Sequence, residues 1–474
     1  MGQEILHQHF SESDFQSFSE KLKIETTLLK EQFNSGQFSS RKPVGGFEIE
    51  ACLINSAYHP TPINKAFLAQ FDNPLATSEL AKFNIELNNL PHPLKNKVFT
   101  QFEKEIHAVF KGADKAAEKL NTRVLLTGIL QTLTTDDCCL ENMTDLKRYH
   151  ALNNVVVHAR QGRPVKLDIS GVEELKLSHD SVMLESATTS FQVHMQTPWQ
   201  DAHHYYNASI IASAPVMAIA GNSPYLFGKQ LWHETRIPVF EQSVDTGDLQ
   251  RVSFGSGFAK ESIMECFDEN LQNYPALLPM VFEDKPEKFK HLCLHNGVIW
   301  RWNRPLIGFD DDGKTHIRIE HRILPAGPTI ADMVANAVFF YGLTQSITMQ
   351  LKQQKKGKQG NIESFQQAKD NFYKTAKHGL HTTLNWHGKQ IKVQKLILDK
   401  MLPLAQSGLL DLGIDKDEIE HYLNIIKQRT ITGQTGAEWQ IQHVKLKNCN
   451  MAELTKDYLH QQHLDNPVHT WSHE

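Results

Sequence analysis

Apolar and polar residues alternate in several short, widely separated stretches of the chain, and each stretch predicts a β-strand. Successive side chains of a strand point to opposite faces, so each stretch has one apolar face and one polar face. The stretches are GFEIEACLI (46–54), NIELNN (84–89), TTSFQVHMQ (188–196) and HIRIEHRIL (316–324). Their polar faces carry Glu48 with Glu50, then Glu86, then His194, and finally Glu320 between Arg318 and Arg322.

Helical spacing of apolar residues predicts much of the remaining scaffold. Residues 13–34 are expected to form an amphipathic helix that begins with a capping box at Ser13, and residues 95–120 and 201–220 are expected to form two further helices. The polar, basic stretch 352–360 is interpreted as a solvated connector. Beyond it, apolar residues recur at helical spacing, which predicts a helical C-terminal part.

These elements predict an α+β fold in which a curved antiparallel β-sheet forms a floor flanked by helices. If the strands lie in one such sheet, their polar faces converge on a single concave surface. We expect a catalytic domain of residues 1–350 and a mainly α-helical C-terminal subdomain of residues 351–474 packed on it. The alternative is that each polar face is solvated independently, because antiparallel sheets often expose one face to water.

Composition and charge exclude several classes of partner. The net charge of -5 and the pI near 6.6 argue against nucleic acid, which requires a basic surface. The longest apolar run, residues 210–220, is too short to span a bilayer, so no membrane partner is expected. The N-terminus has no signal-peptide pattern and none of the 6 cysteines is spaced as CxxC, so we expect a cytoplasmic protein. A homo-oligomer is compatible with these features.

The carboxylates on the expected floor point to a divalent cation. Like charges at this spacing repel one another unless a cation or an arginine lies between them. Oxygen ligands suit Mg²⁺ or Mn²⁺, and magnesium commonly also takes phosphate oxygens, so a nucleotide is expected. The chain has no GxxxxGK[ST] motif, and the GSG of residues 255–257 lacks the context of a dinucleotide-binding turn. Any ATP would therefore be held by metal and arginine.

An ordered series of short motifs resembles the glutamate-cysteine ligase type 2 family of ATP-dependent carboxylate-amine ligases. Each motif is weak alone, but the set follows the family's order over roughly residues 40–380. The motifs are GGFEIE (45–50), SELAKFNIELN (78–88), SFQVHM (190–195), GNSPYLFG (221–228), WHETR (232–236) and IRIEHR (317–322).

The resemblance implies a glutamine-synthetase-like fold and a γ-glutamyl ligase reaction, the chemistry of glutathione biosynthesis. ATP would phosphorylate the γ-carboxylate of glutamate, and an amine, usually that of cysteine, would displace phosphate. Small molecules are thus the expected partners. The implied metal ligands are Glu48, Glu50, Glu79, Glu86, His194 and Glu320. Arg322 and Arg236 are implied as catalytic, phosphate-binding arginines, and we expect substrate contacts from Arg148, Tyr149 and Trp232.

The chain also departs from the family pattern. Residues 128–131 read Gly-Ile-Leu-Gln where relatives often have a Gly-Thr-His-Pro type strand, and His321 replaces the valine of a common Glu-Val-Arg. These changes leave the amine acceptor open. Arg318 has no assigned role and is expected to be a partner of the carboxylates. Two other functions stay open: a catalytically silent ATP- and metal-binding module, and a metal-dependent phosphohydrolase.

Overall fold

The strands predicted from alternation lie in one antiparallel sheet, which confirms the predicted α+β fold. In the computed structural model, which describes residues 5, 10–247, 249–355 and 363–473, this curled eight-stranded sheet has the order β11-β12-β8-β1-β3-β2, and β4 and β5 also pair with β1. The strands are β1 (Val44–Ile54), β2 (Ala76–Ser78), β3 (Asn84–Asn88), β4 (His92–Pro93), β5 (Arg123–Leu125), β8 (Phe191–Thr197), β11 (Asn303–Phe309) and β12 (Thr315–His321).

The strand register brings the polar residues of different strands next to one another. Glu50 lies opposite Glu86 across the β1–β3 pair. Glu320 lies between two neighbours, with His194 opposite it on β8 and Arg304 opposite it on β11. The polar faces therefore form one continuous floor, as expected from the sequence.

Three long helices cover the apolar face of the sheet, namely α3 (Val98–Glu118), α5 (Ala202–Ala220) and α9 (Ile330–Lys355). The ring of Phe47 on β1 packs against Phe102 of α3, with 4.7 Å between ring centroids. On β12, His321 is fully buried and stacks on Phe340 of α9 at 3.9 Å. Burial of these large side chains is the main stabilising term for the sheet.

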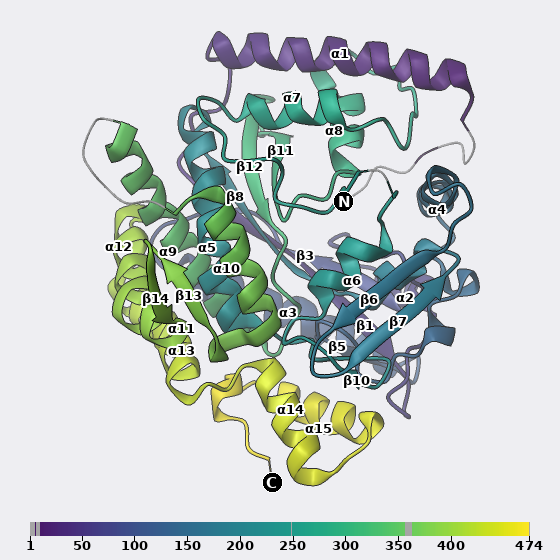
Figure 1. Ribbon diagram of the computed structural model, residues 1–474, viewed down its shortest axis with the longest axis vertical. Coiled ribbons are helices and arrows are strands. Elements are labelled where there is room, and N and C mark those ends of the chain that lie inside the picture. Colours follow the sequence, from purple (N-terminus) through teal and green to yellow (C-terminus); the bar gives the residue numbers. More distant parts are fainter. Residues whose placement is uncertain (1–4, 6–9, 248, 356–362, 474) are drawn as a thin grey trace.

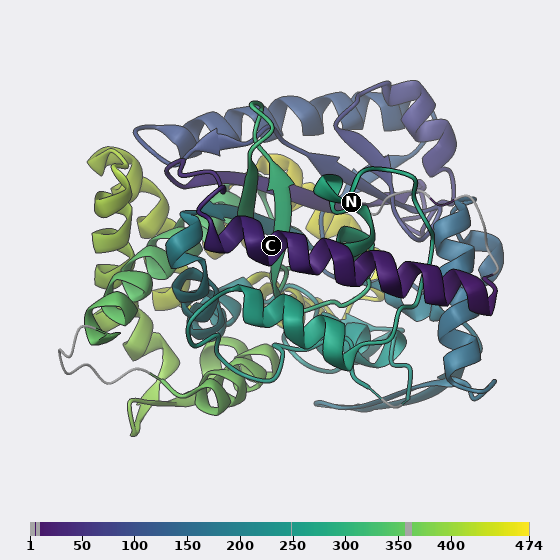
Figure 2. The same ribbon diagram turned by 90° about the horizontal axis from the view of Figure 1, so that it is seen from above.

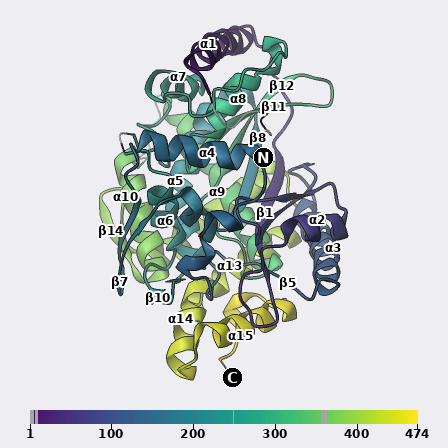
Figure 3. The ribbon, with the colours of Figure 1, turned by 90° about the vertical axis from the view of Figure 1, so that its right-hand side faces the viewer.

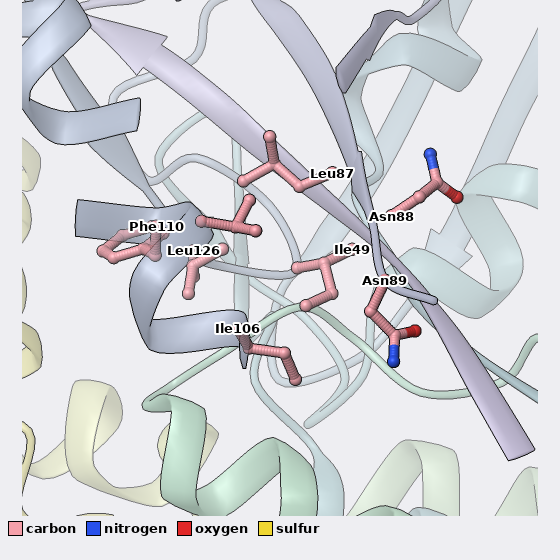
Figure 4. Close-up of a pocket in the computed structure, with 8 residues that line it drawn as sticks. Ile49, Leu87, Asn88, Asn89, Ile106, Phe110 and Leu126 are labelled. Carbon is pink, nitrogen blue, oxygen red and sulfur yellow. The ribbon is translucent and has the colours of Figure 1, made fainter. Parts of the chain in front are cut away.

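The packing between the sheet and α3 is nearly complete. Figure 4 shows Ile49 and Leu87 of the sheet meeting Ile106 and Phe110 of α3 around a cavity of about 10 Å³. That volume is about the size of one water probe and far below the size of a ligand pocket. The functional surface is therefore the other, polar face.

Elements on the polar side of the sheet enclose the floor. They include α4 (Lys147–Ala159), the 3-10 helix Val182–Ala187, α6 (Arg236–Ser243) and the hairpin of β6 (Val165–Ser170) and β7 (Glu174–His179). In Figure 3, α4 and α3 lie on opposite sides of β1. The polar face of the sheet, which is the floor, thus faces this second set of elements.

Helix α1 (Glu12–Asn34) lies across one end of the molecule, over α7 (Met264–Asn273) and α8 (Lys290–Gly297) (Figures 1 and 2). The capping box predicted at Ser13 is wrong. Ser11 caps the helix instead, and the Asp14 carboxylate accepts the backbone N–H of Ser11 at 2.7 Å. An ionised carboxylate is a stronger acceptor than the glutamine amide of the predicted box, which favours the earlier start.

The C-terminal part is mainly helical, as predicted, and α14 and α15 lie at the end opposite α1 (Figure 1). Helix α9 runs through the predicted boundary at residues 350 and 351 and packs against α12, so the division into two domains stays a prediction. The predicted connector 352–360 is wrong for residues 352–355, which continue α9, and its other residues lie outside the described part of the chain. The C-terminal elements are α10 (Phe365–His378), β13 (Thr383–Trp386), β14 (Lys389–Lys392), α11 (Val393–Leu396), α12 (Leu402–Leu412), α13 (Lys416–Thr432), α14 (Gly436–Lys447) and α15 (Met451–Leu464).

Three smaller elements complete the fold. They are α2 (Asn64–Phe71), β9 (Tyr225–Leu226) and β10 (Lys229–Gln230). Within the described part of the chain, no helix combines the length and the apolar character needed to cross a bilayer.

Candidate active site

The predicted metal ligands gather into two groups on the polar floor. Within each group, one ligand atom from every residue lies within 4.8 Å of the others. The first, the Glu48 group, consists of Glu48, His194 and Glu320, and the second, the Glu50 group, consists of Glu50, Glu79 and Glu86. The fold therefore brings together residues that are up to 272 positions apart in the sequence (320 minus 48).

In the Glu48 group, a histidine links the two carboxylates. His194 Nε2 lies 3.2 Å from Glu48 Oε1 and 4.0 Å from Glu320 Oε1. Burial raises the pKa of Glu48, but the charge and hydrogen bond of His194 outweigh burial and lower this pKa to about 2. Arg318 Nε donates to His194 Nδ1 at 3.2 Å. Arg318, expected to be a partner of the carboxylates, thus bonds to the histidine that contacts them.

Arginines hold Glu320 in its ionised form. Arg304 donates to both oxygens of this carboxylate, from Nε at 2.7 Å and from Nη2 at 3.1 Å. Arg322 Nη1 lies 3.2 Å from Glu320 Oε2 and also donates to Gln192. Burial raises the pKa of Glu320, but Arg304 and Arg322 outweigh it and hold the pKa well below its usual range.

Sequence reasoning missed Arg304. Its strand, β11, was not identified, although the alternating stretch of β12 is preceded by the turn residues Asp312 and Gly313. An Asp-Gly pair before a strand is a hairpin signal, and it would have placed an antiparallel partner directly upstream.

The Glu50 group is crowded with negative charge. Glu50 accepts hydrogen bonds from the backbone N–H and the hydroxyl of Ser190, both at 2.7 Å, yet burial raises its pKa. Burial and then Glu48 raise the pKa of Glu86 to about 7. Burial, Glu86 and Glu50 raise the pKa of Glu79 well above its usual range. Three carboxylates that oppose one another's ionisation fit a divalent cation with oxygen ligands, such as Mg²⁺ or Mn²⁺.

A further carboxylate near this group was missed. Glu185 lies in the 3-10 helix Val182–Ala187, where burial and the charge of Glu50 raise its pKa to about 8, while Arg322 opposes the shift. The sequence MLES shows neither alternation nor a motif, so only the fold could place Glu185 beside the floor.

Of the predicted substrate-binding residues, Arg148 and Tyr149 lie beside the Glu50 group. They belong to the first turn of α4. Tyr149 donates to the carbonyl of Ser78 at 3.3 Å, and Arg148 Nη2 donates to the Tyr149 hydroxyl at 2.8 Å. Burial and the neighbouring charge of Glu79 raise the pKa of Tyr149 well above its usual range. Both residues thus border the acidic end of the floor.

Arg236 and Trp232 make hydrogen bonds to other groups of the protein. Arg236 is 2% exposed and bonds Glu234 through Nε at 2.9 Å, and its Nη1 donates to the carbonyl of Arg322 at 3.4 Å. It therefore supports the end of β12, and its predicted role toward phosphate stays a prediction. Trp232 donates to the carbonyl of Ser170 at 3.1 Å and lies on the hairpin side of the site, so its substrate contact also stays a prediction.

The two groups differ in electrostatic character. The Glu48 group contacts Arg304, Arg318 and Arg322, whereas the Glu50 group has Glu185 as a further acidic neighbour. Guanidiniums favour phosphate oxygens, and crowded carboxylates favour cations. The Glu48 group thus combines possible metal ligands with guanidiniums that suit a metal-bound polyphosphate, and the Glu50 group suits a metal ion or an ammonium group.

Comparisons with known proteins give a family match and a shared fold. A family model described as glutamate-cysteine ligase family 2 (GCS2) matches residues 45–461. The glutamate-cysteine ligase of Francisella tularensis, solved in complex with AMP, is 10% identical with a TM-score of 0.54, covering 92% of this chain and 91% of that one. A bifunctional glutathione synthetase from Pasteurella multocida is 11% identical with a TM-score of 0.53, covering 92% of this chain and 55% of that one. These low identities show a shared fold. None of the curated proteins compared with this chain matches it.

Proposed function

The chain belongs to glutamate-cysteine ligase family 2, a family of ATP-dependent carboxylate-amine ligases, and we propose that it joins the γ-carboxylate of glutamate to an amine such as that of cysteine. The γ-phosphoryl group of ATP is transferred to a γ-carboxylate oxygen of glutamate, which gives γ-glutamyl phosphate and ADP. The amine nitrogen then attacks the acyl carbon. The amide bond forms, phosphate leaves with the oxygen it received, and the amine loses a proton.

The observation that carries this proposal is the pairing of an arginine-lined carboxylate group with an acidic one on a single floor. In this account, Arg322 and Arg318 attract the phosphates at the Glu48 group and orient the γ-phosphoryl group. Phosphoryl transfer depends mainly on positioning and on neutralisation of charge. Mg²⁺ or Mn²⁺, held by the Glu48 and Glu50 groups, would supply the remaining neutralisation of the phosphates.

The Glu50 group and its neighbours are proposed to hold the amino-acid substrates. Glu185 offers a carboxylate to an ammonium group, and Arg148 offers a guanidinium to an α-carboxylate, with Tyr149 beside it. This assignment places the γ-carboxylate of glutamate between the acidic end and the arginine end, within reach of ATP. The cytoplasm is the proposed location, in line with 6 cysteines that are all free thiols.

The proposal is tested by incubating the protein with ATP, Mg²⁺, glutamate and a panel of amines that includes cysteine. ADP and phosphate should appear only when glutamate and an accepted amine are both present. Clustered carboxylates also suit two-metal hydrolysis, and phosphate release that does not depend on glutamate would favour a phosphohydrolase. Tight ATP binding without turnover of any amine would favour a silent module.

A further inference from the structure

Arg304 donates to both oxygens of the predicted metal ligand Glu320, and it lies outside the family motifs. It lies on β11 directly opposite Glu320 on β12, and both side chains are buried, 9% and 1% exposed respectively. The two parallel hydrogen bonds, at 2.7 and 3.1 Å, form the bidentate geometry that guanidinium and carboxylate groups favour. Rotation of the Glu320 carboxylate would break at least one of these bonds.

The remaining arm of Arg304 is anchored to a helix. Its Nη1 donates to the carbonyl of Gly297 at 3.1 Å and reaches that of Asn296 at 3.5 Å. These carbonyls belong to the last turn of α8, where unpaired carbonyls and the helix dipole attract a cation. The guanidinium is therefore held from two sides, by the sheet and by α8.

Helix α8 is itself fixed at both ends. Near its N-terminus, Glu25 of α1 accepts the backbone N–H of Leu292 at 2.8 Å and lies 2.5 Å from His291 Nδ1. Near its C-terminus, the Asn296 side chain donates to the carbonyl of Pro305 at 2.9 Å and accepts from Asn270 of α7 at 2.9 Å. Pro305 follows Arg304 directly, so the same contacts hold the strand that carries Arg304.

Arg304 and Arg322 differ in what their guanidiniums can still bind. Nε, Nη1 and Nη2 of Arg304 all donate to protein acceptors. Arg322 Nε, by contrast, is buried and makes no hydrogen bond to any described residue. Arg322 thus retains a donor for a ligand, whereas the donors of Arg304 are occupied by Glu320 and α8.

We propose that Arg304 is a positioning residue, which locks the Glu320 carboxylate onto the end of α8 and so fixes the Glu48 group in the geometry that receives a divalent cation. The inference rests on the proposed function, because that function assigns the Glu48 group to a metal. Partners that orient metal ligands commonly contribute a factor of about 10 to 100 in metal affinity.

Two substitutions test the role by metal binding rather than by activity. Arg304→Lys keeps the charge but cannot form two parallel bonds, and Arg304→Met removes both. Mn²⁺ is titrated into metal-free protein by calorimetry and by electron paramagnetic resonance, with and without a non-hydrolysable ATP analogue. Both variants should bind Mn²⁺ at the Glu48 group about 10- to 100-fold more weakly than wild type.

Arg429→Lys is the matched control. Arg429 also forms a buried pair with a carboxylate, that of Asp332 at 2.6 Å, but it lies in α13 and contacts neither metal group. This variant should lower the Tm and leave Mn²⁺ affinity unchanged. Arg304 variants that lose Tm to the same extent but bind Mn²⁺ like wild type would show a structural role only and would overturn the proposal.

A double-mutant cycle with Glu320→Gln separates positioning from a direct role. If Arg304 acts through Glu320, Arg304→Met should cause no further loss of Mn²⁺ affinity in the Glu320→Gln background. An equal loss in both backgrounds would overturn the proposal. If wild-type protein binds no Mn²⁺ and accepts no amine, the proposed function is overturned as well. If wild-type protein binds Mn²⁺ and turns over an amine, but the Arg304 variants bind Mn²⁺ as tightly as wild type, only the positioning role is overturned.

Discussion

Glutamates on the same floor are held in opposite electrostatic states. Glu320 has its pKa held well below the usual range, because Arg304 and Arg322 outweigh the effect of burial. Glu86 is also buried, but its near neighbours are other carboxylates, and its pKa rises to about 7. Neighbouring charge, rather than burial, therefore decides which carboxylates stay ionised and which resist ionisation in the absence of a cation.

This difference predicts that two isosteric substitutions have the same effect on activity but opposite effects on stability. Glu86→Gln and Glu320→Gln should each lower kcat/KM by at least about 100-fold, or about 2.7 kcal/mol. Glu86→Gln relieves repulsion and should raise the Tm of the metal-free protein. Glu320→Gln leaves Arg304 unpaired and should destabilise the fold by about 3 kcal/mol. Steady-state kinetics and thermal denaturation measure both effects, and full activity in either variant would remove that residue from the mechanism.

The raised pKa values also predict the pH dependence of stability. The folded pKa is about 7 for Glu86 and about 8 for Glu185, both above the usual carboxyl value, so these two groups bind more protons in the folded state than in the unfolded state between about pH 5 and 8. The contribution of these two carboxyls to the stability of the metal-free protein should therefore be lost as pH rises through this window. Mg²⁺ competes with these protons and should raise the Tm more at pH 8 than at pH 5.5.

Thermal denaturation at a series of pH values, with and without Mg²⁺, checks this dependence. Glu86→Gln serves as the control, because it removes one titrating group and should flatten the slope. A Glu86→Gln variant whose metal-free Tm changes with pH as that of wild type does would contradict the account of the Glu50 group.

At the scale of elements, alternation predicted the strands well because each has one buried and one charged face. It could not identify the sheet to which a strand belongs. VKLDIS in β6 alternates as cleanly as NIELN in β3, yet β6 pairs only with β7 in a separate two-stranded sheet. Glu185 escaped prediction for a related reason, because its role depends on packing between distant segments, whereas the hairpin signal before β12 could have revealed the strand of Arg304.

Helices α9 and α12 pack so closely that glycines are required at the contact. A Cβ atom on Gly408 would lie 2.0 Å from the carbonyl oxygen of Gly342, and one on Gly342 would lie 2.4 Å from that of Ala405. Alanine ordinarily stabilises a helix over glycine by about 1 kcal/mol. Overpacking costs about 1 to 3 kcal/mol, and here the obstacle is backbone that cannot rotate away.

Gly408→Ala should therefore destabilise the protein by up to about 2 kcal/mol despite its better helix propensity. Chemical denaturation measures the change. Gly257→Ala is the control, because nothing lies within 4 Å of its added Cβ, and it should leave stability nearly unchanged. A Gly408→Ala variant more stable than wild type would show that the two helices can move apart at little cost.

At the scale of the whole molecule, a buried ion pair joins the C-terminal helices to the rest of the fold. Arg429 of α13 is 1% exposed, donates to Asp332 of α9 at 2.6 Å and to Asn336 at 2.6 Å, and reaches the carbonyl of Ile219 in α5 at 3.0 Å. The other oxygen of Asp332 accepts the backbone N–H of Val468 at 2.9 Å. The C-terminal part is thus tied to the helices that support the sheet.

Arg429→Met should destabilise the whole protein by about 3 to 5 kcal/mol, because it leaves the Asp332 charge buried and unpaired. Urea denaturation should show one cooperative transition for wild type and variant, since the pair joins both parts of the chain. Two separate transitions, with only one shifted by the substitution, would contradict this coupling and would support independent units on either side of residue 350.

In the proposed reaction, ATP phosphorylates the γ-carboxylate of glutamate, and the γ-glutamyl group is then transferred to an amine. To test this reaction, glutamate labelled with ¹⁸O in the γ-carboxylate is incubated with the protein, ATP, Mg²⁺ and an accepted amine. The released phosphate is then analysed by mass spectrometry. The account predicts one ¹⁸O atom in each phosphate, matched by an equal amount of γ-glutamyl amide. Unlabelled phosphate, released whether or not glutamate is present, would contradict it.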